Sequence, residues 1–307
     1  MPPTKLSEAI EYGTLDALIS SWELSLQAGN KSPKTLRVYG DTARMFATFA
    51  RDKLGVTEAR KVTRETVETF IADQLARFKP TTASVRFRSL QQFFKWLAEE
   101  GEIERSPMAT MKPPIVPEVP VPVVADDDLR KLLKVCEGAT FEHKRDLAIL
   151  RVMIETGTRL AEVAGLNLDD VDMADKTITV VGKGRRPRTL PFGTKTAQAF
   201  DRYLRLRPRH PKAASPGLWL GPKGTMTDSG IAQMLERRCG EAGIEKVHPH
   251  QLRHTAAHAW LADGGGEDAA MRLFGWKSRQ MLSRYGASAA DERARDEFRR
   301  RSLGDRL

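Results

Sequence analysis

One proline-rich segment sets the organisation of the chain: Lys112-Pro-Pro-Ile-Val-Pro-Glu-Val-Pro-Val-Pro-Val-Val124. Its five prolines forbid a helix and hold the backbone extended. A length of 307 residues favours two domains over one. The segment therefore predicts a linker, residues 113–124, between an N-terminal domain of residues 1–112 and a C-terminal domain of residues 125–307.

Upstream of the linker, apolar residues recur at the spacing of an amphipathic helix. Four such runs begin at Leu15, Leu36, Val67 and Val85. Ser32-Pro33 and Lys79-Pro80 are signals for the start of a helix, because proline fits the first helical turn. The pattern predicts a four-helix N-terminal domain.

Downstream of the linker, most of the chain also has helical periodicity. Helices are expected over residues 126–136, 143–155, 194–206, 229–242, 250–262, 267–274 and 290–302, and a further one after the turn at Gly157. Two β-rich runs, 177–181 and 188–192, flank Gly182-Lys-Gly-Arg-Arg-Pro187, which predicts a hairpin with a basic tip. The fold class is therefore mainly α, with a small antiparallel β-hairpin in an α-rich C-terminal domain.

The charge of the chain is strongly positive and uneven. The formal net charge is +10, and 33 basic against 25 acidic residues after residue 120 put +8 of it in the C-terminal domain. A polyanion is the expected partner. No apolar run approaches the roughly 20 residues that span a bilayer, and the N-terminus lacks the apolar core of a signal peptide. Two isolated cysteines, Cys136 and Cys239, are typical of a protein of the reducing cytoplasm.

Three histidines raise the question of a metal site. His250, His254 and His258 are spaced four apart and share one face of a predicted helix, as zinc-binding histidines do. However, position 251 is Gln where a zinc-binding HEXXH motif has Glu, and Arg253 brings a positive charge to the same helix. We therefore expect no metal, and His254 and His258 are more simply core or surface residues.

Five motifs follow one another between residues 156 and 285. They are Thr156-Gly-Thr-Arg-Leu-Ala-Glu-Val-Ala-Gly-Leu166, Gly182-Lys-Gly184, Pro249-His-Gln-Leu-Arg-His-Thr255, Leu273-Phe-Gly-Trp276 and Tyr285. In this order they resemble the motifs of the tyrosine recombinase (phage integrase) family, and the four-helix pattern upstream is similar to that family's SAM-like core-binding domain. The resemblance covers nearly the whole chain. It implies a site-specific DNA recombinase of the Xer/Cre type without an arm-binding domain, in which residues 1–112 bind DNA and residues 125–307 are catalytic.

The resemblance implies that Tyr285 is the nucleophile, which cleaves and rejoins duplex DNA through a 3′-phosphotyrosyl intermediate. By similarity, Arg159 and Arg253 hold the oxygens of the scissile phosphate, where negative charge builds up during attack, and His250 assists them. An ordinary phenol with a pKa near 10 is ionised in only about one molecule in a thousand at pH 7, so a base must take its proton. The neutral imidazole of His250 is the best candidate for this base.

Three further residues receive roles from the same resemblance. Lys183 is similar to the family lysine that protonates the departing 5′ oxygen. Trp276 stands where most members have a second histidine, and its indole N–H can donate a hydrogen bond to phosphate but cannot shuttle a proton. Glu162, one helical turn after Arg159, matches the family's acidic position and is expected to orient a catalytic cation. Because a phosphotyrosyl link conserves bond energy, we expect no cofactor, ATP or metal.

The resemblance also implies partners. These are double-stranded DNA with inverted-repeat half-sites and other copies of the chain, as a homodimer on one site and a homotetramer at synapsis. The tail around Arg299-Arg-Arg301 resembles the family's C-terminal helix that docks on a neighbouring protomer, and the enzyme is expected in the cytoplasm with the nucleoid, away from membranes. Basic residues expected to contact DNA are Lys34, Arg37, Arg86, Arg88, Arg185 and Arg186. Two other functions stay open: a type IB topoisomerase, which needs no pair of matched sites, and a DNA-binding relative without catalysis.

Overall fold

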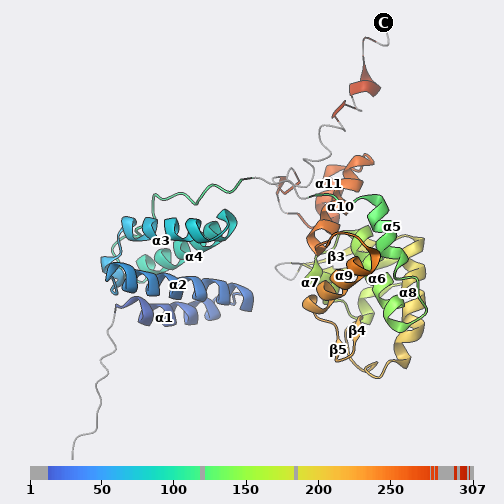
Figure 1. Cartoon of the computed structure of the whole chain (residues 1–307), viewed down its shortest axis with the longest axis horizontal. Helices are drawn as coiled ribbons and strands as arrows, with labels where there is room; N and C mark the ends of the chain where they lie inside the picture. Colours follow the sequence, from blue (N-terminus) through green and yellow to red (C-terminus); the bar gives the residue numbers. More distant parts are fainter. Residues whose placement is uncertain are drawn as a thin grey trace, which may run out of the picture. The chain divides into compact units, whose positions relative to one another are not determined.

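The computed structural model describes residues 13–117, 122–182, 186–276, 278–279, 281–282, 294–295, 298–302 and 304. The chain divides into two compact units, Met1–Glu118 and Val119–Leu307, shown in Figure 1 with colours that follow the sequence. The division falls inside the proline-rich segment.

The N-terminal unit, within residues 13–117, is a bundle of four α-helices. Their bounds are α1 Leu15–Ala28, α2 Pro33–Leu54, α3 Arg64–Arg77 and α4 Pro80–Glu99, with a 3₁₀ turn, η1, at Ala59–Lys61. Both α2 and α4 begin at the predicted prolines, and the Ser32 hydroxyl accepts a hydrogen bond from the backbone N–H of Thr35 at 3.2 Å, which caps α2. The prediction of four helices is confirmed.

Aromatic side chains from the four helices fill this bundle. Trp22 of α1 stacks on Tyr39 of α2 with ring centroids 5.6 Å apart. Phe46 of α2 meets the rings of Phe70 of α3 and Phe94 of α4 edge-on, and all three phenylalanines are fully buried. Because aromatic pairs in these geometries add to the burial of apolar area, they fix α2 between α1 and α4, as Figure 1 shows.

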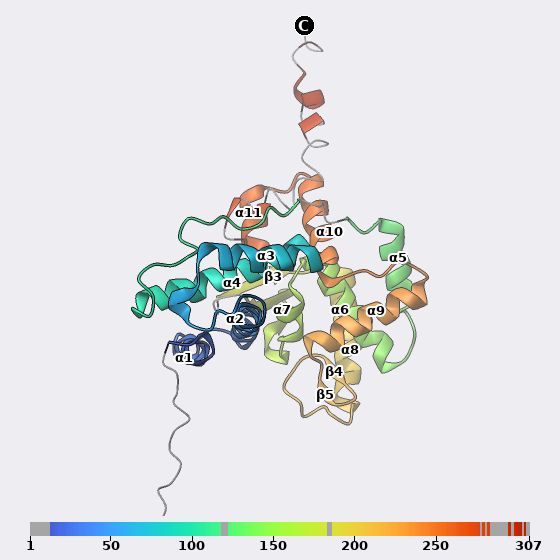
Figure 2. The ribbon, with the colours of Figure 1, turned by 60° about the vertical axis from the view of Figure 1, so that its left-hand side comes forward.

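The C-terminal unit consists of helices and two small sheets. Helix bounds in its described part are α5 Asp126–Lys134, α6 Phe141–Thr156, α7 Leu160–Ala164, α8 Thr194–Leu206, α9 Asp228–Ala242, α10 Pro249–Ala262 and α11 Glu267–Leu273, with 3₁₀ turns η2 Leu168–Asp170 and η3 Arg207–Arg209. The strands β1 Val171–Asp172, β2 Thr177–Val181 and β3 Pro187–Pro191 form one antiparallel sheet in that order. The hairpin of β4 Leu220–Gly221 and β5 Gly224–Thr225 lies at the end of the unit away from α10 and α11 (Figures 1 and 2).

The predicted fold, mainly α with a small antiparallel sheet, is confirmed. The sequence pattern did not reveal β1, β4 or β5, because two-residue strands are too short to show an alternation of apolar and polar residues. The helix expected over 126–136 ends at Lys134. The helix expected over 290–302 lies only partly within the described residues, where 294–295 and 298–301 are helical.

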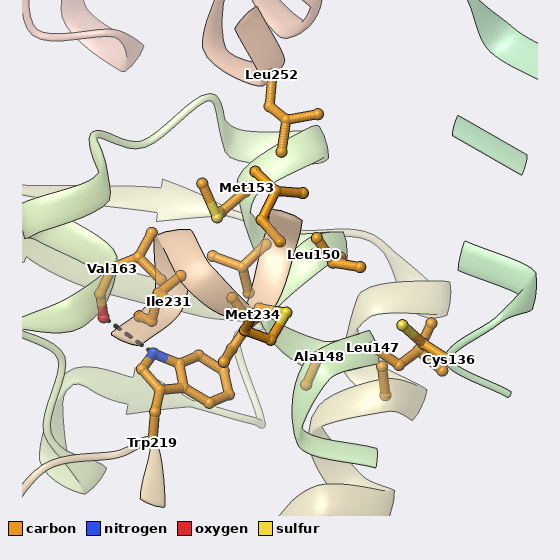
Figure 3. Packing of buried hydrophobic residues seen from close by; sticks show 14 of the residues in the cluster. Cys136, Leu147, Ala148, Leu150, Met153, Val163, Trp219, Ile231, Met234 and Leu252 are labelled. Atoms are coloured by element: carbon orange, nitrogen blue, oxygen red, sulfur yellow. Dashed lines mark hydrogen bonds between the residues drawn. The ribbon is translucent and has the colours of Figure 1, made fainter. Parts of the chain in front are cut away.

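The long helix α6 forms the core of the C-terminal unit. Its residues Leu150 and Met153 belong to one buried cluster with Met234 of α9 and Leu252 of α10 (Figure 3). In the same cluster, the indole N–H of Trp219 donates a hydrogen bond at 2.9 Å to the carbonyl of Val163. This bond joins the short helix α7 to the core.

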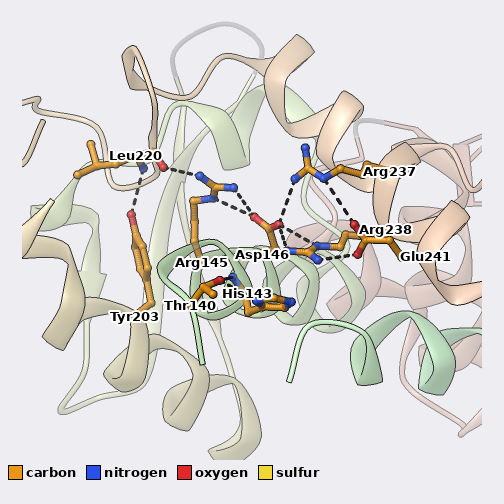
Figure 4. Close-up of polar contacts among 9 residues, drawn as sticks. All are labelled: Thr140, His143, Arg145, Asp146, Tyr203, Leu220, Arg237, Arg238 and Glu241. Carbon is orange, nitrogen blue, oxygen red and sulfur yellow. Dashed lines mark hydrogen bonds and ion pairs between the residues drawn. The ribbon is translucent and has the colours of Figure 1, made fainter. Parts of the chain in front are cut away.

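A buried ion-pair network, drawn in Figure 4, joins α6 to α9. Asp146 of α6 accepts two hydrogen bonds on Oδ1 from Arg145, at 2.8 and 2.7 Å, and two on Oδ2 from Arg238 of α9, at 2.9 and 2.8 Å. Arg145 also donates to the carbonyl of Leu220 at 2.7 Å, and Arg238 to Glu241 at 2.6 Å. These bonds supply the partners that buried charges require.

Candidate active site

Arg159 stands at the junction of α6 and α7. Helix α6 ends at Gly157, whose φ of +57° lies in the left-handed region, and a Cβ at this position would come within 2.5 Å of the Phe274 ring. The chain enters α7 two residues later, with Arg159 as its N-cap. Glycine therefore permits both the turn and the close approach of Phe274 that places Arg159.

The carboxylate of Glu162, on α7, accepts four hydrogen bonds from two arginines. Arg159 donates its backbone N–H to Oε2 and Nη1 to Oε1, both at 2.8 Å. Arg188 of β3 donates Nη1 to Oε1 at 2.8 Å and Nη2 to Oε2 at 2.7 Å. Burial raises the pKa of Glu162, but the hydrogen bonds from Arg188 and Arg159 outweigh it and lower the pKa to about 2. Glu162 is therefore ionised at neutral pH and is bonded to Arg159. That Glu162 orients a catalytic cation stays a prediction.

Arg188 is a residue of this site that the sequence motifs did not reveal. A signal was nevertheless present, because Arg188 pairs across the sheet with the buried Val180 and lies two residues before the buried Leu190. Cross-strand partners and alternate residues share one face of a sheet, so Arg188 occupies an inward position. An arginine there requires a buried partner of opposite charge, which is Glu162.

Arg253 enters the site from α10 and is almost completely buried, at 1% exposure. Its Nη1 donates to the carbonyl of Gly157 at 2.7 Å and its Nη2 to the carbonyl of Phe274 at 2.5 Å. The guanidinium carbon lies 5.8 Å from the centroid of the Phe274 ring. Arg253 thus ties α10 to the end of α6 and to the end of α11.

The end of α11 is a Schellman motif. The backbone N–H of Trp276 donates to the carbonyl of Met271 at 2.9 Å, and that of Gly275, with φ +62°, donates to the carbonyl of Arg272 at 3.2 Å. The carbonyls that follow, at the negative end of the helix dipole, have no partner within a helix and need donors from elsewhere.

Three arginines from three elements supply those donors to three consecutive carbonyls. Arg188 Nε donates to Leu273 at 2.9 Å, Arg253 Nη2 to Phe274 at 2.5 Å and Arg159 Nη2 to Gly275 at 3.3 Å. With the carboxylate of Glu162, the group carries three positive charges and one negative charge. We call these three arginines and three carbonyls the arginine cluster.

Two further predicted site residues, His250 and Trp276, lie close in the sequence to members of the arginine cluster. His250 is exposed in the first turn of α10, one turn before Arg253, and its ring meets that of His254 edge-on with centroids 5.0 Å apart. Trp276 directly follows the last of the three carbonyls and is buried at 5% exposure, stacked on Phe274 with centroids 5.0 Å apart. The structure therefore brings Arg159, Glu162, Arg253 and Trp276 together around the end of α11.

Three predicted site residues, Lys183, Arg185 and Tyr285, lie outside the described residues. Arg186 is exposed at the base of the β2–β3 hairpin, where its carbonyl accepts a hydrogen bond from the backbone N–H of Gly182 at 3.0 Å. The roles of these four residues stay predictions.

The basic residues predicted on the N-terminal unit differ in their surroundings. Lys34 and Arg37 on α2 and Arg88 on α4 are exposed. Arg86 is half-buried, donates a hydrogen bond to the Gln74 side chain and stacks over the Phe78 ring, 4.1 Å from its centroid. Burial and the nearby charge of Arg77 lower the pKa of Arg86. Arg86 therefore also joins α4 to α3.

A cavity of about 420 Å³ lies beside the end of α11. Its apolar lining includes Ile154, Leu190, Phe192, Ala256, Trp260, Leu273 and Phe274. Two acidic residues, Glu155 and Asp263, also line it. Leu273 and Phe274 thus contribute their carbonyls to the arginine cluster and also line this cavity.

The described residues contain no group of three or more His, Cys, Asp or Glu side chains that could hold a metal ion. Burial raises the pKa of Cys136 to about 12, so its thiol is a poor nucleophile at neutral pH. In the part of the chain that the structure covers, no helix has the length and apolar character to cross a membrane.

Both units match known protein families. The model of the phage integrase family matches residues 122–292, and the model of the phage integrase N-terminal SAM-like domain matches residues 19–101. The tyrosine recombinase XerC of Thermodesulfovibrio yellowstonii is 31% identical over 270 residues, which cover 85% of this chain and 88% of that protein.

Solved structures give the same fold. The integrase of the Tn1549 transposon, in complex with transposon right end DNA, aligns with a TM-score of 0.75 at 19% identity, over 94% of this chain and 99% of that one. A lambda integrase tetramer bound to a Holliday junction aligns with a TM-score of 0.67 at 16% identity, over 86% of this chain and 78% of that one.

Proposed function

Since this chain belongs to the phage integrase family of tyrosine recombinases, a family of DNA strand-transferring enzymes, its function is site-specific recombination, and we propose how its residues carry out that reaction. Tyr285 is the nucleophile, and Arg159 and Arg253 bind the scissile phosphate. The observation that carries this proposal is the arginine cluster. Two guanidinium groups bonded to the carbonyls of the adjacent residues Phe274 and Gly275 are close enough to address one phosphate.

In the proposed reaction, the phenolic oxygen of Tyr285 attacks phosphorus and gives its proton to His250. The bond from phosphorus to the 5′ oxygen breaks, and Lys183 protonates that oxygen, so the products are a 3′-phosphotyrosyl link and a free 5′-hydroxyl. In the second half of the reaction, the 5′-hydroxyl of a partner strand attacks the link and releases Tyr285, which regains its proton. Arg159 and Arg253 stabilise the charge on the non-bridging oxygens in both halves of the reaction. Trp276 donates a hydrogen bond from its indole N–H to the phosphate.

The N-terminal unit takes the role of a DNA-binding domain in this proposal, with residues 113–124 as the linker to a catalytic domain of residues 125–307. Its match to the SAM-like domain and the exposed positions of Lys34, Arg37 and Arg88 support that role. We expect binding to weaken with salt, at a log–log slope of about −0.9 for each phosphate neutralised. The enzyme would act in the cytoplasm on the DNA of the nucleoid.

We also propose that copies of the chain assemble on inverted-repeat half-sites, as dimers on one site and tetramers at synapsis. The tail of one protomer would insert Phe298, which is 74% exposed, into the cavity beside α11 of the next. The apolar lining of that cavity suits an aromatic ring, and its residues Glu155 and Asp263 suit the basic residues 299–301.

The assembly is tested by comparing Phe298→Ala with Leu24→Ala, which removes another exposed apolar side chain, on α1. Phe298→Ala should bind an isolated half-site like the wild type and lose cooperativity between two half-sites, whereas Leu24→Ala should keep both. Equal cooperativity in all three proteins would refute the proposed docking.

The catalytic proposal is tested with a nicked suicide duplex that carries the cognate site. Wild-type protein should form a covalent adduct, and Tyr285→Phe should bind the same duplex and form none. Tyr203→Phe is the matched control, because Tyr203 is buried and donates its hydroxyl to the carbonyl of Leu218. An adduct that persists in Tyr285→Phe would sink the assignment, and relaxation of plasmids without any specific site would point instead to a type IB topoisomerase.

A further inference from the structure

Arg188 has the contacts of a residue that serves the reaction through its neighbours. It uses Nη1 and Nη2 on the carboxylate of Glu162 and Nε on the carbonyl of Leu273. Its side chain is 14% exposed, against 38% for Arg159. Arg159 is therefore the exposed cation of the group, and Arg188 is set apart by its bidentate bond to Glu162.

We infer that Arg188 is a positioning residue, which neutralises Glu162 so that Arg159 keeps its positive charge for the scissile phosphate. The inference rests on the proposed function. Glu162 has one negative charge and two cationic partners, so the three side chains together keep a net charge of +1. Without Arg188, Glu162 and Arg159 would form a one-to-one ion pair with no net charge, and the arginine cluster with Glu162 would offer a phosphate one net positive charge, that of Arg253, instead of two.

The second contact of Arg188 fixes the position of the same group. By bonding to Leu273, Arg188 holds the end of α11 against α7, and the next two carbonyls of that segment bind Arg253 and Arg159. Gly275 contributes to this close fit, because a Cβ there would stand 3.3 Å from the guanidinium carbon of Arg188. Loss of Arg188 would thus change the charge and the orientation of Arg159 together.

Loss of Arg188 would also alter the titration of Glu162. Burial raises the pKa of this carboxyl, and the hydrogen bonds from Arg188 are the largest of the influences that lower it. In Arg188→Gln the pKa of Glu162 therefore rises. A protonated Glu162 no longer orients Arg159 as an anion would. Cleavage by the variant should therefore slow with falling pH in a range where Glu162 of the wild type stays ionised.

The test compares Arg188→Gln, Arg188→Lys and Thr189→Ala in the full chain on the suicide duplex. Thr189 is the matched control on the same strand, with an exposed side chain whose hydroxyl bonds to Thr179 at 3.1 Å. At saturating DNA, we expect cleavage to slow by about 10- to 100-fold in Arg188→Gln and by less in Arg188→Lys, as for the loss of a group that orients a catalytic residue. DNA affinity should stay within about threefold of wild type, because Arg188 does not face the phosphate.

The decisive readout is the ratio of the wild-type rate to the Arg188→Gln rate between pH 8 and pH 5. The inference expects this ratio to rise as the pH falls and to stay flat for Thr189→Ala. A flat ratio for Arg188→Gln, or rates within threefold of wild type for both variants, would overturn it. If Arg188→Gln does not fold, Arg188→Lys decides, because lysine keeps the charge but cannot make the bidentate contact. A wild-type cleavage rate in Arg188→Lys overturns the inference. Partial cleavage activity at wild-type DNA affinity supports it. A wild type that forms no adduct at all would refute the proposed function instead, which keeps the two failures distinct.

Discussion

Two carboxylates of the C-terminal unit are each bonded to arginines, yet the two groups differ in what balances their exposed cation. At Asp146, Arg145 and Arg238 are each 5% exposed, and a third arginine, Arg237, is 54% exposed, bonds to Asp146 at 3.4 Å and lies 3.9 Å from Glu241. At Glu162, whose side chain is 4% exposed, Arg159 is 38% exposed. The exposed cation of the first group thus has a second carboxylate beside it, whereas Arg159 shares a single carboxylate with Arg188.

The same chemical unit thus joins helices in one place and, in the proposed reaction, takes part in catalysis in another. In the Asp146 group, Arg145 uses a further donor on Leu220, which binds α6 to the β4 strand, and Arg238 uses one on Glu241 within α9. In the Glu162 group they point to the end of α11, beside residues proposed to bind phosphate. Loss of the buried carboxylate should therefore lower stability in either group, whereas loss of the exposed Arg159 should lower the reaction rate.

The largest effect is expected from Asp146→Ala, which removes the counter-charge of the buried Arg145 and leaves the buried Arg238 with Glu241 alone of its two carboxylates. The free energy of unfolding of the C-terminal unit should fall by about 3–5 kcal/mol, as when one partner of a buried pair is removed. Urea denaturation followed by circular dichroism measures it. Asp201→Ala, which breaks the exposed pair with Arg205, is the control and should change stability by less than about 1 kcal/mol. Equal effects of the two variants would show that the buried Asp146 network stabilises the protein no more than an exposed ion pair does.

Arg159→Ala should act on the rate rather than on stability. Loss of one donor to the developing charge slows strand cleavage by about 100- to 1,000-fold, or about 3–4 kcal/mol, with an unfolding free energy close to that of the wild type. Single-turnover cleavage of the suicide duplex and urea denaturation of the same preparations measure the two quantities. Arg205→Ala serves as the control. A loss of cleavage below tenfold would remove Arg159 from its proposed role.

Glu162→Gln should reveal a pH-dependent contribution to stability. The pKa of Glu162 is about 2 in the folded protein against an ordinary 4.5, so the folded state favours the charged form. The resulting stability, on the order of 3 kcal/mol, is present above pH 4.5 and is lost as the pH falls towards 2. The unfolding free energies of wild type and Glu162→Gln should therefore differ at pH 7 and converge at low pH. A difference that stays constant down to pH 2.5 would show that the charge of Glu162 has no part in it.

The smallest effect is expected from Gly157→Ala, at the turn before Arg159. A left-handed conformation costs an alanine about 1–2 kcal/mol, and here the new Cβ also meets the Phe274 ring. Gly243→Ala is a matched control, because Gly243 has φ +63° but open space around it. Thermal unfolding should show a larger loss for Gly157→Ala than for Gly243→Ala. If the two losses are equal, the contact with Phe274 contributes nothing.

The sequence predicted the parts of this molecule that local pattern determines. The periodicity of the apolar residues predicted the helices of the N-terminal unit, and Pro33 and Pro80 marked where two of them begin. The strand over residues 177–181 was predicted with its exact bounds. The motifs around Arg159 and Arg253 marked residues that the fold brings to one place. Each of these signals lies within a short stretch of chain.

What the sequence did not predict depends on tertiary contacts and on the backbone. The role of Arg188 follows from its contact with Glu162, 26 residues away, and from the pairing of β3 with β2, which turns its side chain inward. The acceptors of the arginine cluster are carbonyls, which every residue has and which no pattern of side chains can mark. The Asp146 group was missed for a similar reason, since Arg238 lies 92 residues from its partner.

The three carbonyls at the end of α11 also bear on when the arginines become ordered. Backbone oxygens hold the guanidinium planes before any DNA is bound, so the rotamer entropy of three long side chains, up to about 2 kcal/mol each, is lost during folding rather than during the encounter with substrate. In the proposed reaction, an incoming phosphate would then meet Arg159 and Arg253 already held in place. Preorganisation of this kind links the folding of α11 to the speed of the first chemical step.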